Sequence, residues 1–597
     1  MNTATTRRLV AGTALPVLAA LGLYGCKDTL TDAGAPQGTL SGQAVATLAG
    51  VEGSLIAAYR ALDYTSSVGG NAWANAASDW IWASVTSDDA YKGSIDSDQP
   101  PATDVELYQW STANADGYFN DRWRGLYEGV SRANATLTNL KSLQASGGVS
   151  ASDAAGIAGE AIFLRAHYHF EAWRMWGNIP YYREDDTDFR KANEPSAQVV
   201  TDLLKDLDSA IVLLPTSPRG GSKGRATKWA AKAYKGRVQA YAGQWAAALA
   251  TLTDVKNNGP YKLEDSFDRV WTAFPQYANG PETILAYEAS ANDGDPNGSN
   301  ANWGERLNFP HSGSPFGCCG FHQPSQNLVN FYRVDPASGL PLAVTSPGTW
   351  NANNDNFVAG NQAPVDPRLD WTVGRDGVPY KDWVAAPASN GLPNETWNRD
   401  RSYGGPYHPK KNVQEQASGG TSTVGWTPTQ LNSVKMHIFR YADALLLLAE
   451  AEVEAGSLEN ARTIVNQIRT RAAVKVQGPG TSTTTLAVPI NDPSITWATY
   501  KVGLYPSFPS QDYARTAVHD ERRLELAMEG QRFFDLKRWG VAQQTLNDYL
   551  AVEKSRRSYL ASATPFAARN LLFPIPSTQI RLSEVGGTST LTQNPGW

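Results

Sequence analysis

The chain has 597 residues, with 52 Lys and Arg against 58 Asp and Glu, so its formal net charge at pH 7 is −6. This acidic balance argues against a nucleic-acid-binding protein, which needs a basic face to neutralise phosphates, and three Cys are too few for a multi-bridge disulfide scaffold. The hydrophobic content of 41% predicts a globular chain with a large core, and 19 Trp are enough that some indole rings should serve a purpose besides packing.

Residues 1–25 have the order of a secretory signal. Arg7 and Arg8 precede an apolar stretch, residues 9–23, that is too short to span a membrane as a helix. The sequence before Cys26 resembles a bacterial lipobox, so we expect cleavage there and acylation of the Cys26 thiol, with residues 26–42 as a flexible tether. The alternative is an ordinary signal peptide with an incidental Cys.

Helical periodicity then predicts a mostly α-helical protein. A helix over residues 152–176 carries apolar side chains on one stripe and stops at Gly177. Two pairs of helices follow, each joined by a very short turn: 227–242 with 245–257, and 434–455 with 458–473. Each pair is about 34 residues long, the size of a tetratricopeptide unit, and one such hairpin cannot cover its own apolar face. We therefore expect a tetratricopeptide-like scaffold of stacked helical hairpins.

Two segments interrupt this pattern and are rich in Gly, Asn and Trp. One is a loop near residues 71–101, and the other is the long stretch 261–429, which has little periodicity. Because long structureless loops are rare inside domains, we expect 261–429 to form an inserted irregular subdomain that carries a binding surface. The predicted order is a helical region over 43–260, the irregular subdomain, a second helical region over 430–545, and a C-terminal segment, 546–597, that packs on the scaffold.

Several motifs spread along the whole chain resemble the SusD/RagB family of surface lipoproteins. They are residues 123–129 (WRGLYEG), 160–170 (EAIFLRAHYHF), 176–180 (WGNIP), 440–445 (RYADAL), 466–472 (NQIRTRA), 520–526 (DERRLEL), 529–539 (EGQRFFDLKRW), 573–576 (FPIP) and 593–597 (QNPGW).

The resemblance implies a SusD-like fold and a role in nutrient uptake without catalysis. A protein of this kind is held by its lipid on the outer face of the outer membrane. There it covers a SusC-like TonB-dependent barrel and passes on oligosaccharides or, in some members, peptides. Two rival functions are a surface glycoside hydrolase, which needs two carboxylates in a cleft, and an assembly scaffold without a small ligand.

Sugar sites combine flat aromatic faces with planar polar groups, and two predicted loops offer this mixture. The candidate ligand-binding residues are Trp73, Asn75, Asp79 and Trp82 in the first loop, and Trp303, Arg306, Phe316, Cys318, Cys319 and Phe321 in the second. The alternative is that half or more of these aromatic rings belong to the core, with Trp80 and Trp82 as the foremost examples.

The adjacent Cys318 and Cys319 could close a vicinal disulfide outside the cell, where thiols are oxidised. We hypothesise such a ring, flanked by Phe316 and Phe321, as part of the ligand platform. The alternative is a pair of reduced, buried thiols.

Further polar patterns suggest calcium binding, catalysis or a metal centre. Asp293, Asp295 and Asn297 fit the opening of a calcium loop, although Gly304 stands where a closing Glu is usual, so an Asx turn is the alternative. No other cofactor is expected.

The Arg and carboxylate residues of 520–539 are interpreted as locks between helices rather than catalytic acids. His167 and His169 point to different faces of one helix, which disfavours a shared metal.

Overall fold

The computed structural model describes residues 46–63, 70–383, 392–418, 430–474 and 497–597. The predicted signal, Cys26 and the tether lie outside these residues. As predicted, the protein is mostly α-helical. The long helices are α3 (Leu48–Arg60), α5 (Asp116–Ala145), α6 (Ala151–Trp176), α7 (Ser196–Leu213), α8 (Lys228–Tyr241), α9 (Trp245–Asn258), α14 (Tyr441–Ala455), α15 (Leu458–Ala472), α16 (Gln511–Leu526) and α18 (Ala542–Arg556).

Helix α6 shows how local sequence sets these boundaries. The Ser150 hydroxyl caps its first turn by accepting a hydrogen bond from the Asp153 amide at 3.1 Å. The helix ends before Gly177, whose φ of 74° lies in a region that favours glycine. The helix predicted over 152–176 is therefore confirmed.

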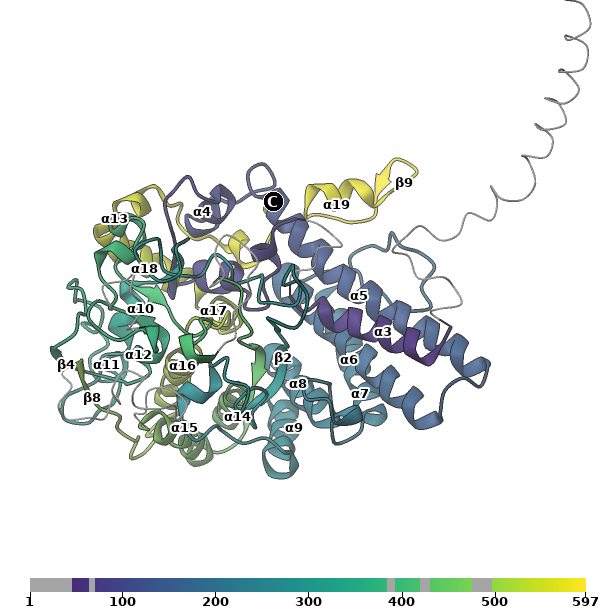
Figure 1. Ribbon diagram of the computed structural model, residues 1–597. Coiled ribbons are helices and arrows are strands. Elements are labelled where there is room, and N and C mark those ends of the chain that lie inside the picture. Colours follow the sequence, from purple (N-terminus) through teal and green to yellow (C-terminus); the bar gives the residue numbers. More distant parts are fainter. Residues whose placement is uncertain (1–45, 64–69, 384–391, 419–429, 475–496) are drawn as a thin grey trace, which may run out of the picture.

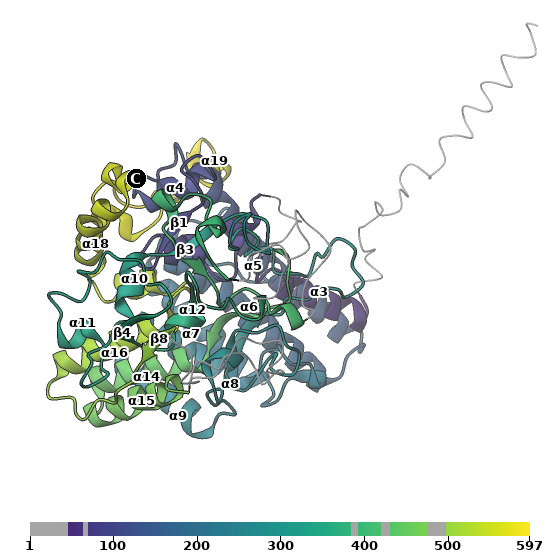
Figure 2. The same ribbon diagram turned by 60° about the vertical axis from the view of Figure 1, so that its left-hand side comes forward.

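The two predicted hairpins are present as α8 with α9 and as α14 with α15. They stack because α9 packs against α14, and α14 also contacts α16. Figure 1 shows α3, α5 and α6 beside the first hairpin, and α14 to α16 beyond it. The turned view in Figure 2 keeps this order. Stacking buries the apolar faces that a single hairpin would expose.

The start of the second hairpin differs from the prediction. Residues 436–440 form strand β7 (Met436–Arg440), which pairs antiparallel with β2 (Thr283–Tyr287), so Ile438 is not on a helical stripe. All five residues of β7 are buried. Helix α14 begins only at Tyr441, because Arg440 is extended (φ −128°, ψ 163°) and directs its guanidinium to three buried carboxylates.

The remaining elements are short. The strands pair in twos: β1 (Ala90–Gly93) with β3 (Phe321–Pro324), β4 (Asn361–Val365) with β8 (Ala498–Tyr500), β5 (Val373–Gly374) with β6 (His408–Pro409), and β9 (Glu584–Val585) with β10 (Thr588–Ser589). The short helices are α4 (Pro100–Glu106), α10 (Gln326–Phe331), α11 (Leu342–Thr345), α12 (Leu369–Thr372), α13 (Arg401–Gly404), α17 (Arg532–Arg538) and α19 (Ser577–Leu582). Figure 1 shows α10 to α13 gathered to one side of the hairpins.

The segment near 71–101 is not a surface loop throughout. It contains the π-helix η2 (Trp80–Val85) and β1, and both are fully buried. The C-terminal segment closes the core over it, since the ring of Phe573 packs 5.4 Å from that of Trp82. Helix α18 runs across the predicted boundary at residue 546.

Buried ion pairs join α16 and α17 to distant parts of the chain. Arg522 contacts Asp443 at 2.8 Å, and Arg532 contacts Asp88 at 2.8 Å. Arg523 also reaches Asp88, at 3.1 Å. Burial alone would raise the pKa of Asp88, but the two arginines outweigh it and lower the pKa to about 2. The charged residues of 520–539 thus lock elements together, as predicted.

Gly530 lies where no side chain fits, so Gly530→Ala is expected to destabilise the protein. Its φ is 70°, and an added Cβ would overlap the backbone oxygen of Ser78. Gly540 is a matched control, because its φ is 73° but nothing lies within 4 Å of an added Cβ. We expect Gly530→Ala to cost about 1–3 kcal/mol more than Gly540→Ala in urea unfolding, from overpacking alone. Equal costs would contradict the close contact.

Candidate functional site

The two stretches predicted to bind ligand lie against each other. Strands β1 and β3 pair so that Gly93 lies opposite Phe321. The Asp63 carboxylate accepts hydrogen bonds from the amides of Ala77 at 2.8 Å and Gly304 at 3.1 Å. One short side chain thus holds both stretches, which are more than 200 residues apart in sequence.

Three of the predicted aromatic ligand residues are in the core. Trp82, Phe316 and Phe321 have exposed fractions of 1%, 0% and 0%. Trp82 donates its indole N–H to the Ala74 carbonyl at 2.9 Å, and Phe316 packs 4.8 Å from Trp383. The prediction that these rings contact a ligand is wrong, because no face of them reaches the surface.

Asn75 and Asp79 are also buried, at 4% and 5% exposure. Asp79 accepts hydrogen bonds from Arg122 and Arg174. Burial raises the pKa of Asp79 to about 7, although both arginines act to lower it. Asp79 is a structural ion-pair partner rather than a ligand contact, which corrects the prediction.

Trp73 and Trp303 are half-buried. Trp73 donates its indole N–H to the Tyr118 hydroxyl at 2.8 Å, and Trp303 donates to the Gly298 carbonyl at 2.8 Å. The Arg306 guanidinium lies 4.7 Å from the Trp303 ring and is largely buried, and burial lowers the pKa of Arg306. Trp73 and Trp303 are therefore partly accessible, and their ligand contact stays a prediction, whereas Arg306 is buried beside the Trp303 ring.

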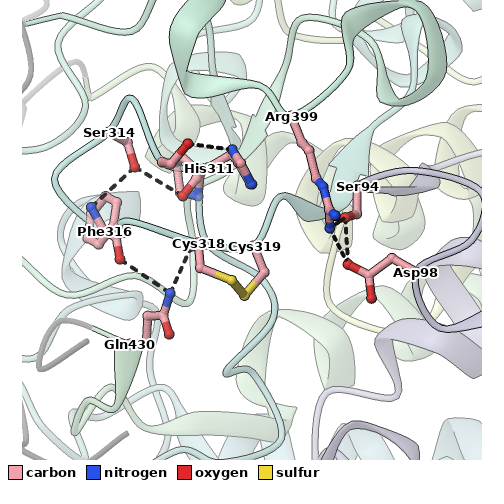
Figure 3. The surroundings of a disulfide bond; sticks show 11 residues. Ser94, Asp98, His311, Ser314, Phe316, Cys318, Cys319, Arg399 and Gln430 are labelled. Atoms are coloured by element: carbon pink, nitrogen blue, oxygen red, sulfur yellow. Dashed lines mark hydrogen bonds and ion pairs between the residues drawn. A yellow bond between two sulfur atoms is a disulfide. The ribbon is translucent and has the colours of Figure 1, made fainter. Parts of the chain in front are cut away.

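Cys318 and Cys319 are joined by a disulfide, so the alternative of two reduced thiols is wrong (Figure 3). Cys319 is buried and Cys318 is partly exposed, so one edge of the ring reaches the surface. The Gln430 amide supports the ring from below by donating to the carbonyl oxygens of Cys318 at 3.0 Å and Phe316 at 3.2 Å.

Polar side chains that the sequence analysis missed flank this disulfide (Figure 3). Arg399 forms an ion pair with Asp98 and donates to the Ser94 hydroxyl at 2.9 Å. An added Cβ on Gly320, the residue after Cys319, would lie 3.6 Å from the Cβ of His311 and 3.9 Å from that of Arg399. We call Cys318, Cys319, His311, Arg399 and Asp98 the disulfide surface.

The disulfide surface presents an apolar edge beside polar groups of several kinds. The side chains of Arg399 and Asp98 are 35% and 27% exposed, so both can reach a ligand. Burial, with a smaller effect of Arg399, lowers the pKa of His311, which favours a neutral imidazole at pH 7. The mixture suits a polyhydroxylated ring, whose C–H face can lie on the disulfide while its hydroxyls bind the polar groups.

Local sequence could have pointed to part of this surface. Asp98 lies within the predicted loop near 71–101, and His311 lies between Trp303 and Phe321. Arg399 carried no local signal, because its relation to Asp98 spans 301 residues.

The predicted calcium loop forms an exposed turn. Asp295 accepts hydrogen bonds from the amides of Asn297 at 2.8 Å and Ser299 at 2.9 Å, and Asp293 accepts from Asn300 at 3.0 Å. This is the bonding expected for the Asx-turn alternative.

Within the described residues, no group of three His, Cys, Asp or Glu could hold a metal ion. His167 contacts the Tyr234 hydroxyl and His169 contacts the Arg165 carbonyl, so the two rings diverge as predicted.

Family comparison decides the assignment. Residues 281–597, more than half of the chain, match the model of the SusD family. The chain therefore belongs to the SusD family. Residues 65–239 of this SusD family member also match a model described as "Starch-binding associating with outer membrane". In the described part of the chain, no helix combines the length and apolar character needed to cross a bilayer.

Individual relatives of this SusD family member match it over most of its length. SusD-like protein P25 of Formosa agariphila is 23% identical, and the match covers 80% of this chain and 79% of P25. SusD-like protein P38 of the same organism is 25% identical, and the match covers 67% of this chain and 69% of P38. Among solved structures, a laminarin-binding SusD-like protein has a TM-score of 0.65 at 23% identity and covers 92% of this chain and 100% of its own. Surface glycan-binding protein A from Bacteroides thetaiotaomicron, in complex with laminarihexaose, has a TM-score of 0.64 at 18% identity and covers 92% and 99%. These structures share the fold of this SusD family member.

Proposed function

We propose that this SusD family member binds an oligosaccharide at the cell surface without cleaving it. The observation that carries the proposal is the disulfide surface, which places an apolar ring edge beside exposed guanidinium, carboxylate and imidazole groups. Asp98 is held by Arg399 and Ser94, so it is suited to accept a hydrogen bond from a hydroxyl rather than to transfer a proton. The named ligands of two structural neighbours, laminarin and laminarihexaose, support a glycan.

We propose further that the bound glycan is delivered to a SusC-like TonB-dependent barrel in the outer membrane. The lipobox-like sequence before Cys26 supports anchoring by lipid on the outer leaflet. The family description that mentions outer-membrane association supports the same location.

Glycan binding through the disulfide surface predicts that Arg399→Ala weakens affinity about tenfold or more, because hydrogen bonds to charged groups contribute about 1.5–3 kcal/mol. Calorimetric titration of the purified protein with a panel of soluble oligosaccharides measures this effect. Arg269→Ala is the control, since Arg269 also pairs with an aspartate, Asp265, on the surface of the irregular region. Affinity should stay unchanged in this control.

The same titrations separate the proposal from its rivals. Chromatography of the glycan after incubation should recover it intact, and released products would instead indicate a glycoside hydrolase. Binding of peptides but of no glycan would assign peptide as the cargo. Unaltered glycan affinity in Arg399→Ala would show that the ligand binds elsewhere.

A further inference from the structure

A cavity lies in the helical scaffold, and it shares no residue with the disulfide surface. Its volume is about 270 Å³, and it lies where the end of α6, the start of α7 and α17 meet. Three aromatic rings and three cations line it: Trp173, Tyr241, Phe534, Arg174, Lys537 and Arg538. The volume is below the range of about 300–1,000 Å³ for drug-sized ligands, so a small molecule is the fitting occupant.

Lys537 places an amino group without a carboxylate partner at this cavity. Its ammonium donates one hydrogen bond, to the Arg174 carbonyl at 2.7 Å. Within the described residues it has no ion pair, and the groups that act on it are burial and the like charge of Arg174, which lower its pKa to about 7. An ammonium has three N–H donors, so two remain for a ligand.

Arg174 adds positive charge beside the same cavity. Its residue exposure is 4%, and its Nη2 binds Asp79 at 2.9 Å and also Glu171. Its Nε and Nη1 are buried, and the described residues supply neither atom with a hydrogen-bond acceptor. Arg538, by contrast, is neutralised by Glu450 at 2.6 Å.

The surroundings carry an excess of positive charge. Among the described residues, Arg122 and Arg174 pair with two carboxylates, Asp79 and Glu171, and Lys537 pairs with none. Arg237 lies against the Tyr241 ring that also lines the cavity, and it donates hydrogen bonds to the Ile438 carbonyl and to the side-chain oxygen of Gln531.

The start of α7 adds a helix N-terminus. Ser196 lines the cavity, and its amide donates to the Asn178 side-chain oxygen at 2.8 Å, while the preceding Pro195 supplies no cap of its own. The N-terminal end of an 18-residue helix carries a partial positive charge that favours anions.

We propose that this cavity binds an oxyanion, a sulfate or carboxylate group, carried by a molecule no larger than a monosaccharide. The Lys537 amino group binds the anion, the positive charge of Arg174 and of the start of α7 stabilises it, and Trp173 and Tyr241 can contact a sugar ring that bears it. This inference does not depend on the disulfide surface, since none of its residues is shared with it.

Thermal unfolding of the purified protein tests the proposal. Inorganic sulfate should raise the melting temperature saturably, beyond the effect of sodium chloride at equal ionic strength. Glucuronate and glucose 6-sulfate should also raise the melting temperature, whereas uncharged glucose should not. Comparing inorganic sulfate with the two acidic sugars shows whether the cavity prefers a free ion or an acidic sugar. Lys537→Met keeps the aliphatic stem and should weaken the apparent affinity at least tenfold. Lys554→Met, at an exposed helical lysine, is the matched control and should respond as wild type does.

A measurement on the unaltered chain keeps the proposal falsifiable if Lys537→Met does not fold. Sulfate or glucuronate should protect Lys537, but not Lys554, from acetylation in peptide mass spectrometry. The proposal is overturned if no oxyanion acts beyond the chloride control, if Lys537→Met responds as wild type does, or if Lys537 is not protected. None of these outcomes would affect glycan binding measured with Arg399→Ala.

Discussion

Replacing Glu525 with glutamine is expected to lower the free energy of unfolding by about 3–5 kcal/mol, the range for breaking a buried ion pair from one side. Glu525 is fully buried on α16. One carboxylate oxygen accepts from Arg440 at 2.7 Å and from Arg471, and the other accepts from Arg368 at 2.9 Å. Burial alone would raise the pKa of Glu525, but the three arginines outweigh it and hold the pKa well below its usual range.

Urea unfolding of Glu525→Gln and of Glu459→Gln checks this. Glu459 is a matched control, since it also pairs with an arginine, Arg462, on a helix but is exposed, and we expect no measurable change in stability for Glu459→Gln.

Because the folded-state pKa of Glu525 is lowered, the stabilisation from Glu525 is complete above the unfolded pKa of about 4.3 and is lost as the pH falls towards the folded value. The gap between wild type and variant should therefore narrow in acid. If the difference in free energy of unfolding between wild type and Glu525→Gln stays constant into strong acid, Glu525 is not the ionised partner of the three arginines.

Trp82→Ala is expected to lower the free energy of unfolding by about 3–5 kcal/mol while leaving glycan affinity unchanged. The ring is 1% exposed and packs 5.4 Å from both Phe119 and Phe573, so its removal leaves a cavity in the core. It also leaves the Ala74 carbonyl without the indole donor.

Denaturant unfolding and glycan titration of the same preparation separate the two roles that the sequence allowed for Trp82. Trp303→Ala is the comparison, because Trp303 is half-buried and its loss should cost less stability. A Trp82→Ala protein as stable as wild type that no longer bound glycan would restore the ligand role and contradict the packing.

Local signals predicted the helical scaffold well. Gly177 marks the end of α6 in the sequence and in the structure, and the predicted start at residue 152 lies one residue after the observed start at Ala151. The turn at Gly243 similarly joined α8 to α9 as expected. The strand over 436–440 was missed because its partner, β2, lies about 150 residues earlier, and apolar residues in 436–440 also fit a helical stripe.

The candidate site was predicted less well, because whether a side chain is buried depends on residues that are distant from it in the sequence. Trp82 and Trp73 lie in the same loop-like sequence, yet Trp82 is buried against Phe573 while Trp73 stays partly exposed. The vicinal disulfide was found because Cys318 and Cys319 are adjacent. Arg399 could not be found, since nothing in its local sequence shows that Asp98 and Gly320 lie beside it.

The ion pairs of Asp88 and Asp89 have a consequence for how the chain is made. Arg532 pairs with Asp88 across 444 residues, and Arg523 pairs with Asp89 across 434. A ribosome delivers both aspartates long before either arginine, and burying a carboxylate without its partner is costly. The packing around Asp88 and Asp89 can therefore be completed only when residues 523–532 have reached them, so this part of the core depends on the carboxyl-terminal region of the chain.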